Sequence, residues 1–353
     1  MSLMTVLFMG GLMISSVGFS VWCFRHLTKE RWQMMAVIPL RKREDGCWDG
    51  LNLTYYGLFN GIAFTGAAAL AFILLASVRV SPAMAIAILA ILIAICAPAS
   101  SIVARWVEGK KHTLTVGGAA FVGIVLAPWL IVAAELLRQR AGLAAEVSAW
   151  PVLAALAITY AFGEGLGRLA CISFGCCYGR PLSSLPPRWQ VWLDRLSFRF
   201  RGHTRKIAYA SGLAHQPVLP VQAITNLLYL AASFAGTGLF LSGRYYLACV
   251  VPLAVTQLWR IGSEFLRADY RGNATFSAYQ RMSVISLLYM AMLPLLLPVI
   301  PVDPPSLTDG LHALLSLPVL LLLQGLFIFA FVYTGCSSVT GSVVAFNVKS
   351  DRI

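Results

Sequence analysis

Residues 167–181, GRLACISFGCCYGRP, stand where an apolar run ends, and they place arginine, three cysteines and several glycines at the mouth of a membrane segment. A charged side chain in such a segment is costly and usually serves a function. Glu164 lies four residues before Arg168, so the two share one helix face as an acid–base pair. The stretch predicts a helix that carries a polar site into a membrane. The plainer interpretation is a pair that neutralises itself near the lipid headgroups.

The composition of the whole chain indicates a membrane protein. Of its 353 residues, 59% are hydrophobic and 12% are charged, whereas a soluble domain has about 25% charged residues. A stretch of about 20 apolar residues crosses a bilayer, and such stretches recur along the chain. We expect eight or nine spans, from the runs 3–21, 53–77, 83–104, 114–137, 150–166, 220–241, 245–262, 281–302 and 312–333.

These runs predict an all-α polytopic membrane protein in three parts. Residues 1–51 form an extra N-terminal span and a basic loop, 52–302 form a seven-helix core with a polar loop at 179–219, and 303–353 form an extra C-terminal span and tail. The first run lacks the basic start and the small-residue cleavage site of a signal peptide, so we expect it to be retained.

The basic residues are distributed unevenly over the loops. The loops 22–50, 105–113, 167–219 and 260–281, together with the C-terminus, hold 23 of the 27 Lys and Arg. The positive-inside rule places this side in the cytoplasm and the N-terminus outside; the alternative is that the arginines serve anionic lipid headgroups. The net charge of +13 therefore reflects membrane-flanking loops, and we expect no nucleic-acid partner.

Cysteine and histidine supply further candidate residues. The spacing of Cys171, Cys176 and Cys177 is not the paired pattern of a structural zinc site, so we expect no metal. Thiols near arginine are more reactive, which makes them candidate nucleophiles or small packing residues of a tight turn. His112 follows two lysines and is either a general base or a solvated flank.

A second ionic pair sits at the end of the seventh run. Arg260 and Glu264 are also four residues apart and lie on the same predicted membrane side as Arg168. The planar fork of arginine suits a phosphate oxyanion. Two arginines from separate helices would therefore clamp the phosphate of a phospholipid and stabilise its departure.

The segment GRLACISFGCCYG resembles the signature of the prolipoprotein diacylglyceryl transferases, which is Gly-Arg-x-Gly-Asn, four residues, an acidic residue and x-x-Gly; Gly167, Arg168 and Gly179 match it. Further segments over 52–302 resemble that family in order: YYGLFNGIAFTG, TVGGAAFVG, LPVQAITNLL, WRIGSEFLRADYRG and YQRMSVISL. Their matching residues are Tyr56, Gly57, Gly117, Gly118, Pro220, Gln222, Arg260, Glu264, Gln280 and Ser283.

Enzymes of that family move the diacylglyceryl group of phosphatidylglycerol onto a cysteine thiol of a lipoprotein precursor and release glycerol phosphate. The resemblance implies such a transferase in a bacterial cytoplasmic (inner) membrane, with a transferase-like core and no cofactor. The candidate catalytic residues are Arg168, Arg260, Glu264, His112, Cys171 and Cys176. The candidate substrate-binding residues are Tyr56, Gly117, Gly118, Glu164, Gly167, Gly179, Gln222 and Gln280. Glu264 would orient Arg260, and Tyr56 would line the cavity.

The sequence departs from the family where the acceptor is activated. Val116 stands in place of the family histidine, with His112 one helical turn earlier, and Cys171 and Cys176 replace the asparagine and the acidic residue of the signature. Glu164 is a candidate replacement carboxylate. The family also keeps its site on the outer face, whereas the charge bias here favours the cytoplasmic face. Two alternatives follow: a related lipid-modifying transferase with a different acceptor, and a non-enzymatic lipid or anion transporter.

Overall fold

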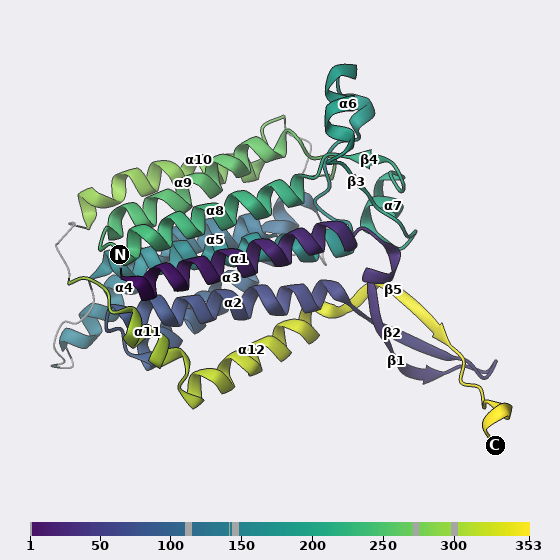
Figure 1. Cartoon of the computed structure of the whole chain (residues 1–353), viewed down its shortest axis with the longest axis horizontal. Coiled ribbons are helices and arrows are strands. Elements are labelled where there is room, and N and C mark those ends of the chain that lie inside the picture. The colour runs from purple at the N-terminus through teal and green to yellow at the C-terminus, as the bar shows by residue number, and fades with distance from the viewer. Residues whose placement is uncertain (1, 110–114, 141, 143–147, 271–274, 298–302) are drawn as a thin grey trace.

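The protein is a bundle of long helices. The computed structural model describes residues 2–109, 115–140, 142, 148–270, 275–297 and 303–353. Seven helices of this described part are long and apolar enough to cross a membrane: α1 (Leu3–His26), α2 (Tyr55–Ser77), α3 (Pro82–Glu108), α4 (Val116–Arg140), α5 (Ala149–Phe174), α8 (Val221–Leu241) and α12 (Leu317–Gly335). The expected polytopic helical membrane protein is confirmed at this level. Two helices of similar length, α9 (Tyr245–Glu264) and α10 (Ala278–Leu296), complete the bundle (Figure 1).

Helix α5 forms the centre of the bundle. It is the most deeply buried of the seven spans, since 78% of its apolar stretch lies inside the structure. It packs against α2, α8 and α9. Small residues allow this close approach: a side chain at Gly163 would meet Ala67 of α2 at 2.8 Å. The apolar run that the sequence predicted ends at residue 166, because Glu164 and Arg168 lower the hydropathy there. The helix itself continues through both residues to Phe174.

The remaining helices surround this core. Helix α1 packs against α8, α3 packs against α4, and α10 packs against α9 and α4. The predicted single run 312–333 is divided into a short helix, α11 (Leu307–Leu314), and α12, both packed against α2. Pro318 lies at the start of α12, where a proline fits a helix without breaking it.

A small sheet adds to the helices that the sequence predicted. Strands β1 (Met34–Lys42), β2 (Trp48–Thr54) and β5 (Cys336–Val344) form an antiparallel sheet in the order β1-β2-β5, in which Leu51 pairs with Gly341. Short turns of 3-10 helix lie at Glu30–Trp32 and Ser350–Arg352. The N-terminal and C-terminal parts, expected as separate extensions, therefore meet in one sheet (Figure 1).

The polar loop 179–219 contains several short elements. These are a 3-10 turn (Leu182–Ser184), α6 (Pro187–Asp194), β3 (Phe198–Arg199), α7 (Lys206–Ser211) and β4 (Pro217–Val218), and β3 pairs with β4.

Arg205 fixes this loop to the bundle. Its side chain is fully buried and donates to the carbonyls of Arg201, Ile172, Ser173, Leu27 and Lys29 at 2.6 to 3.0 Å. Burial lowers the pKa of Arg205 to about 10, so the guanidinium still carries its charge at neutral pH.

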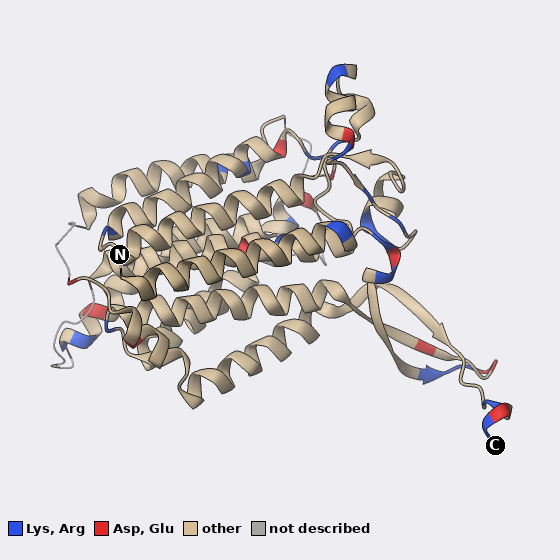
Figure 2. Cartoon of the chain, in the orientation of Figure 1, with Lys and Arg blue, Asp and Glu red and all other residues tan. Residues whose placement is uncertain are grey.

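The elements expected on the basic side share one end of the bundle. Tyr279 donates to Glu108 at 2.9 Å, which joins the start of α10 to the end of α3, and Arg180 donates to Leu266, which joins the loop after α5 to the end of α9. The sheet and the short elements of the polar loop project from this end, and the N-terminus lies at the other (Figure 1). Basic residues are frequent on these projections (Figure 2).

Candidate functional site

Glu164 and Arg168 form the expected pair on the C-terminal half of α5. They are in direct contact one helical turn apart, with 4% and 12% of their side chains exposed. Both side chains therefore lie inside the bundle.

Arg260 reaches the same carboxylate from α9. Its Nη2 donates to both carboxylate oxygens of Glu164, at 2.8 and 2.7 Å, and to the hydroxyl of Tyr160 at 2.9 Å. Its side chain is 10% exposed. Two arginines from separate helices thus converge on one buried carboxylate, whereas the sequence spacing had paired Arg260 with Glu264.

Both guanidinium groups keep an unused donor. The Nε atoms of Arg168 and Arg260 are buried and have no hydrogen-bond partner within the described part of the chain. Together with Glu164 they carry a net charge of +1, and a buried excess charge is costly unless an anion offsets it. This arrangement has the donors and the charge to receive a phosphate or another oxyanion.

Glycine at the start of α4 makes room for Arg260. A side chain at Gly117 would lie 2.9 Å from Nη1 of Arg260 and 2.8 Å from the ring of Tyr279. Gly118 faces the other way and allows α4 to approach Val103 of α3, at 2.6 Å from a side chain built there. Gly117 therefore borders the site directly, and Gly118 supports it through helix packing.

The three cysteines converge beside the end of α5. The Sγ atoms of Cys171, Cys176 and Cys177 all lie within 4.8 Å of one another. None of the eight cysteines, all of which lie in the described part of the chain, forms a disulfide bond. Hydrogen bonds with Cys171 and Cys177, together with burial, raise the pKa of the Cys176 thiol well above its usual value.

Tyr56 and Gln222 surround these thiols. The ring of Tyr56 packs against Phe174, with 5.5 Å between the ring centroids, and its phenol lies within electrostatic range of the three sulfurs. Gln222 is 1% exposed and donates to the carbonyl of Cys176 at 2.9 Å. Both residues thus lie near the thiols, and the hydrogen bond from Gln222 stabilises the turn at Cys176.

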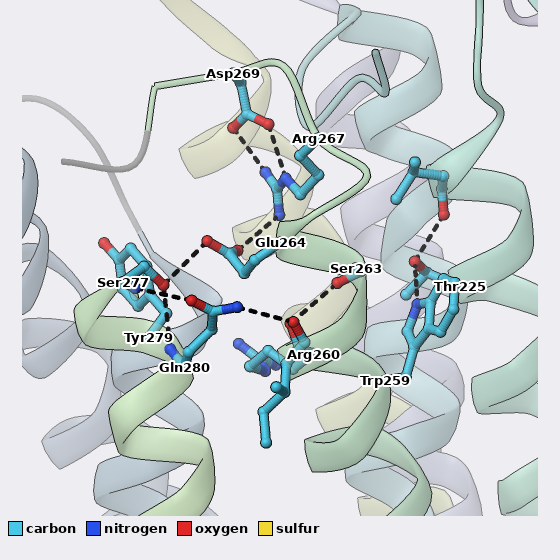
Figure 3. Close-up of polar contacts among 12 residues, drawn as sticks. Thr225, Trp259, Arg260, Ser263, Glu264, Arg267, Asp269, Ser277, Tyr279 and Gln280 are labelled. Atoms are coloured by element: carbon cyan, nitrogen blue, oxygen red, sulfur yellow. Dashed lines mark hydrogen bonds and ion pairs between the residues drawn. The ribbon is translucent and has the colours of Figure 1, made fainter. Parts of the chain in front are cut away.

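Glu264 and Gln280 have other partners than expected. Glu264 lies 3.8 Å from Arg267 and accepts from Ser277 at 3.2 Å, so Glu164 takes the role of orienting Arg260 that the resemblance gave to Glu264 (Figure 3). Gln280 closes a capping box with Ser277 and donates to the carbonyl of Ile261 at 3.0 Å. These contacts cap α10 and join it to α9.

The remaining candidate residues within the described part of the chain are two glycines. A side chain at Gly167 would lie 4.0 Å from Ala63 of α2, and a side chain at Gly179 would meet the backbone oxygen of Leu219 at 2.4 Å. Thr225, which was not a candidate, lies on α8, where it donates to the carbonyl of Val221 and accepts from Trp259 at 2.8 Å (Figure 3). His112 lies outside the described residues.

Sequence reasoning missed two polar residues of the site. Tyr160 precedes Glu164 by four residues, which continues the stripe of Glu164 and Arg168 by one helical turn, so this signal was present in the sequence. Gln257 donates to Tyr160 at 3.5 Å and precedes Arg260 by three residues on α9. A surface depression of about 400 Å³, lined by residues 41–45 and Asp49, lies at the turn between β1 and β2 and is separate from this site.

Neither a protein-family model nor a curated protein matches this sequence. The fold and the contacts define a multi-pass helical membrane protein with a buried arginine–carboxylate cluster beside three thiols.

Proposed function

We propose that this protein is a phospholipid-dependent diacylglyceryl transferase of a bacterial cytoplasmic membrane. Phosphatidylglycerol is the donor, and a thiol, in the first place the cysteine of a lipoprotein precursor, is the acceptor. The observation that carries the proposal is the convergence of Arg168 and Arg260 on Glu164, with an unpartnered Nε on each arginine among the described residues.

The two arginines would act on the phosphate of the donor. Glu164 holds both guanidinium groups in place and leaves a surplus positive charge that the phosphate diester would balance. Since the cluster is buried, its hydrogen bonds and charges act more strongly than they would in water. The resemblance of the segments around Arg168 and Arg260 to the transferase signature supports the same assignment.

The reaction exchanges a carbon–oxygen bond for a carbon–sulfur bond. The acceptor thiolate attacks the terminal glycerol carbon of the diacylglyceryl group, and the bond from that carbon to the phosphate oxygen breaks. The electron pair leaves with this oxygen, so that glycerol phosphate is released and a thioether remains. Arg168 and Arg260 would stabilise the negative charge that grows on the leaving phosphate.

The test uses purified protein in phosphatidylglycerol vesicles with a peptide that carries a lipoprotein-type cysteine. Lipopeptide and glycerol phosphate should appear in equal amounts by mass spectrometry, and a serine peptide should give no product. Arg168→Lys and Arg260→Lys should each lower the rate about 100-fold, because lysine keeps the charge and loses the planar fork. Arg195→Lys, at an exposed arginine of the polar loop, is the matched control. Folded wild-type protein without either product would reject the proposal.

A transferase with a different acceptor is the second candidate, because Val116 stands where the family has its histidine. Val116 begins α4 and is 50% exposed, and it offers no group to activate a thiol. Glycerol phosphate released with a membrane extract but not with the peptide would favour this candidate.

A further inference from the structure

Helix α5 ends in a turn that directs three thiols inward. Gly175 takes the left-handed conformation with φ 72° and caps the helix, and the amide of Cys176 donates to the carbonyl of Cys171 at 3.1 Å. Cys177 also has a left-handed backbone, with φ 54°, which costs energy for a residue other than glycine and persists only where the surroundings enforce it. Buried Gln222 holds the carbonyl of Cys176 from α8. The turn is therefore fixed by the fold.

The distances among the thiols match those around a metal ion. A tetrahedral Zn²⁺ with Zn–S bonds of about 2.3 Å places its sulfur ligands about 3.8 Å apart, and the three Sγ atoms lie within 4.8 Å of one another. We propose that Cys171, Cys176 and Cys177 bind one thiophilic metal ion, Zn²⁺ in the first place, through three thiolates. The sequence expectation of no metal rested on the paired zinc motif, and it did not account for a helix end that folds residue 171 back toward 176 and 177.

The charges around the thiols favour such a complex. Arg168 lies within electrostatic range of Cys171 and Cys177, Lys206 of Cys176 and Cys177, and Arg267 of Cys177. Three thiolates and one Zn²⁺ carry a net charge of −1, and these three cations lie around it, although Arg168 also pairs with Glu164 and Arg267 with Asp269. Soft thiolate ligands select Zn²⁺ or Cu⁺ over the hard ions Mg²⁺ and Ca²⁺.

Three protein ligands leave the fourth position of the ion open, as in catalytic rather than structural zinc sites. This step rests on the proposed function: the acceptor thiol would occupy the open position. A thiol that binds the ion loses its proton to water and becomes the nucleophilic thiolate. The metal ion would thereby activate the acceptor thiol in place of the family histidine, whose position is occupied by Val116 in this chain.

Metal content and thiol protection test the site without any lipid substrate. Protein purified under reduction, stripped with a chelator and reloaded with Zn²⁺ should hold one ion per chain by elemental mass spectrometry. Reloading with Cd²⁺ should give the ultraviolet absorption of cadmium–thiolate bonds. In wild-type protein, Zn²⁺ should slow alkylation of Cys171, Cys176 and Cys177, read residue by residue from peptides, and leave Cys47 unchanged.

Variants assign the ligands. We expect Zn²⁺ binding to weaken by more than about 100-fold in each of the variants Cys171→Ser, Cys176→Ser and Cys177→Ser, because loss of a direct ligand should cost more than loss of an outer-shell partner, which costs up to about 100-fold. The variants Cys47→Ser and Cys249→Ser should bind Zn²⁺ as the wild type does. Wild-type protein that elutes as one species and binds no Zn²⁺ would overturn the site, as would unchanged binding by the three serine variants. Zn²⁺ binding without lipid transfer would uphold the metal site and reject the transferase. If the absorption spectrum of Co²⁺-loaded protein does not change when cysteine is added, the open coordination position is rejected.

Discussion

Arg260 of α9 binds both carboxylate oxygens of Glu164 of α5, at 2.8 and 2.7 Å, across 96 residues of sequence. The same carboxylate contacts Arg168. One acidic side chain therefore holds two cations inside the bundle and joins two of its central helices.

Glu164→Gln should be the most damaging single substitution in this cluster. It leaves two buried guanidinium groups without their carboxylate, and breaking a buried ion pair typically costs about 3–5 kcal/mol. The free energy of unfolding in detergent, followed by circular dichroism, measures this loss. Glu44→Gln, at an exposed position of the β1–β2 turn, should change it by less than about 0.5 kcal/mol. Equal stability of both variants would contradict the buried role of Glu164.

Gly117→Ala should displace the guanidinium of Arg260. The added methyl would lie 2.9 Å from Nη1 and 2.8 Å from the ring of Tyr279, so the guanidinium must shift from the position in which it binds Glu164. We expect lipid transfer to fall at least about tenfold, since a small misplacement of a positioning group costs up to about 100-fold. The control is Gly262→Ala on α9, where nothing lies within 4 Å of the added methyl. A transfer rate unchanged in Gly117→Ala would show that the position of Arg260 does not matter.

Arg205→Lys should loosen the polar loop although it keeps the charge. Arg205 donates to five backbone carbonyls, and a lysine ammonium has only three donors on one atom. A buried acceptor left without a partner costs about 1–3 kcal/mol, so we expect a loss of stability of that order at least. Hydrogen exchange of residues 172–176 and 205–211, compared with Arg195→Lys, measures the effect. Wild-type exchange in Arg205→Lys would refute it.

Removal of β5 should expose the β1–β2 hairpin. Asn52 is 2% exposed, and its amide donates to Thr340 at 3.1 Å while its carbonyl accepts from Ser342. A chain ending at residue 335 loses these contacts, and trypsin should then cleave faster at Arg41, Lys42 and Arg43. A chain ending at residue 346 keeps β5 and should resist as the full chain does. Equal cleavage of the two truncations would show that β5 does not protect the hairpin.

The orientation of the bundle can be read from Cys47, which lies in the hairpin at the end with the polar loop. If the positive-inside rule holds, an impermeant thiol reagent should label Cys47 in inside-out vesicles and not in intact cells. Thr308→Cys, at an exposed position of α11 at the other end, should show the opposite pattern, and Cys47→Ser gives the background. Labelling of Cys47 from outside would reverse the assignment of the cytoplasmic face.

The sequence predicted most of the spanning helices because most of them are apolar along their own length; seven helices of the described part meet this description, where eight or nine spans were expected. The run 53–77, for example, became α2 from Tyr55 to Ser77. The sheet was not predictable in this way, since Leu51 pairs with Gly341. A local sequence pattern does not indicate a pairing partner so far along the chain.

The candidate site was predictable in part for the same reason. Spacing placed Glu164 with Arg168 because both lie in one helix, and it misplaced Glu264 because α9 ends there and the side chain turns to Arg267 and Ser277. The bond between Arg260 and Glu164 joins separate helices, so only the folded structure could reveal which carboxylate serves Arg260.

The contact between Glu164 and Arg168 has a consequence for how the protein is made. Helix α5 must enter the bilayer during synthesis before the ribosome has produced Arg260, which comes 96 residues later. In that interval Arg168 alone neutralises the acid, so the nascent segment crosses as an internally compensated helix. A chain without Arg168 should therefore insert α5 less efficiently, because the carboxylate of Glu164 would enter the bilayer without a partner.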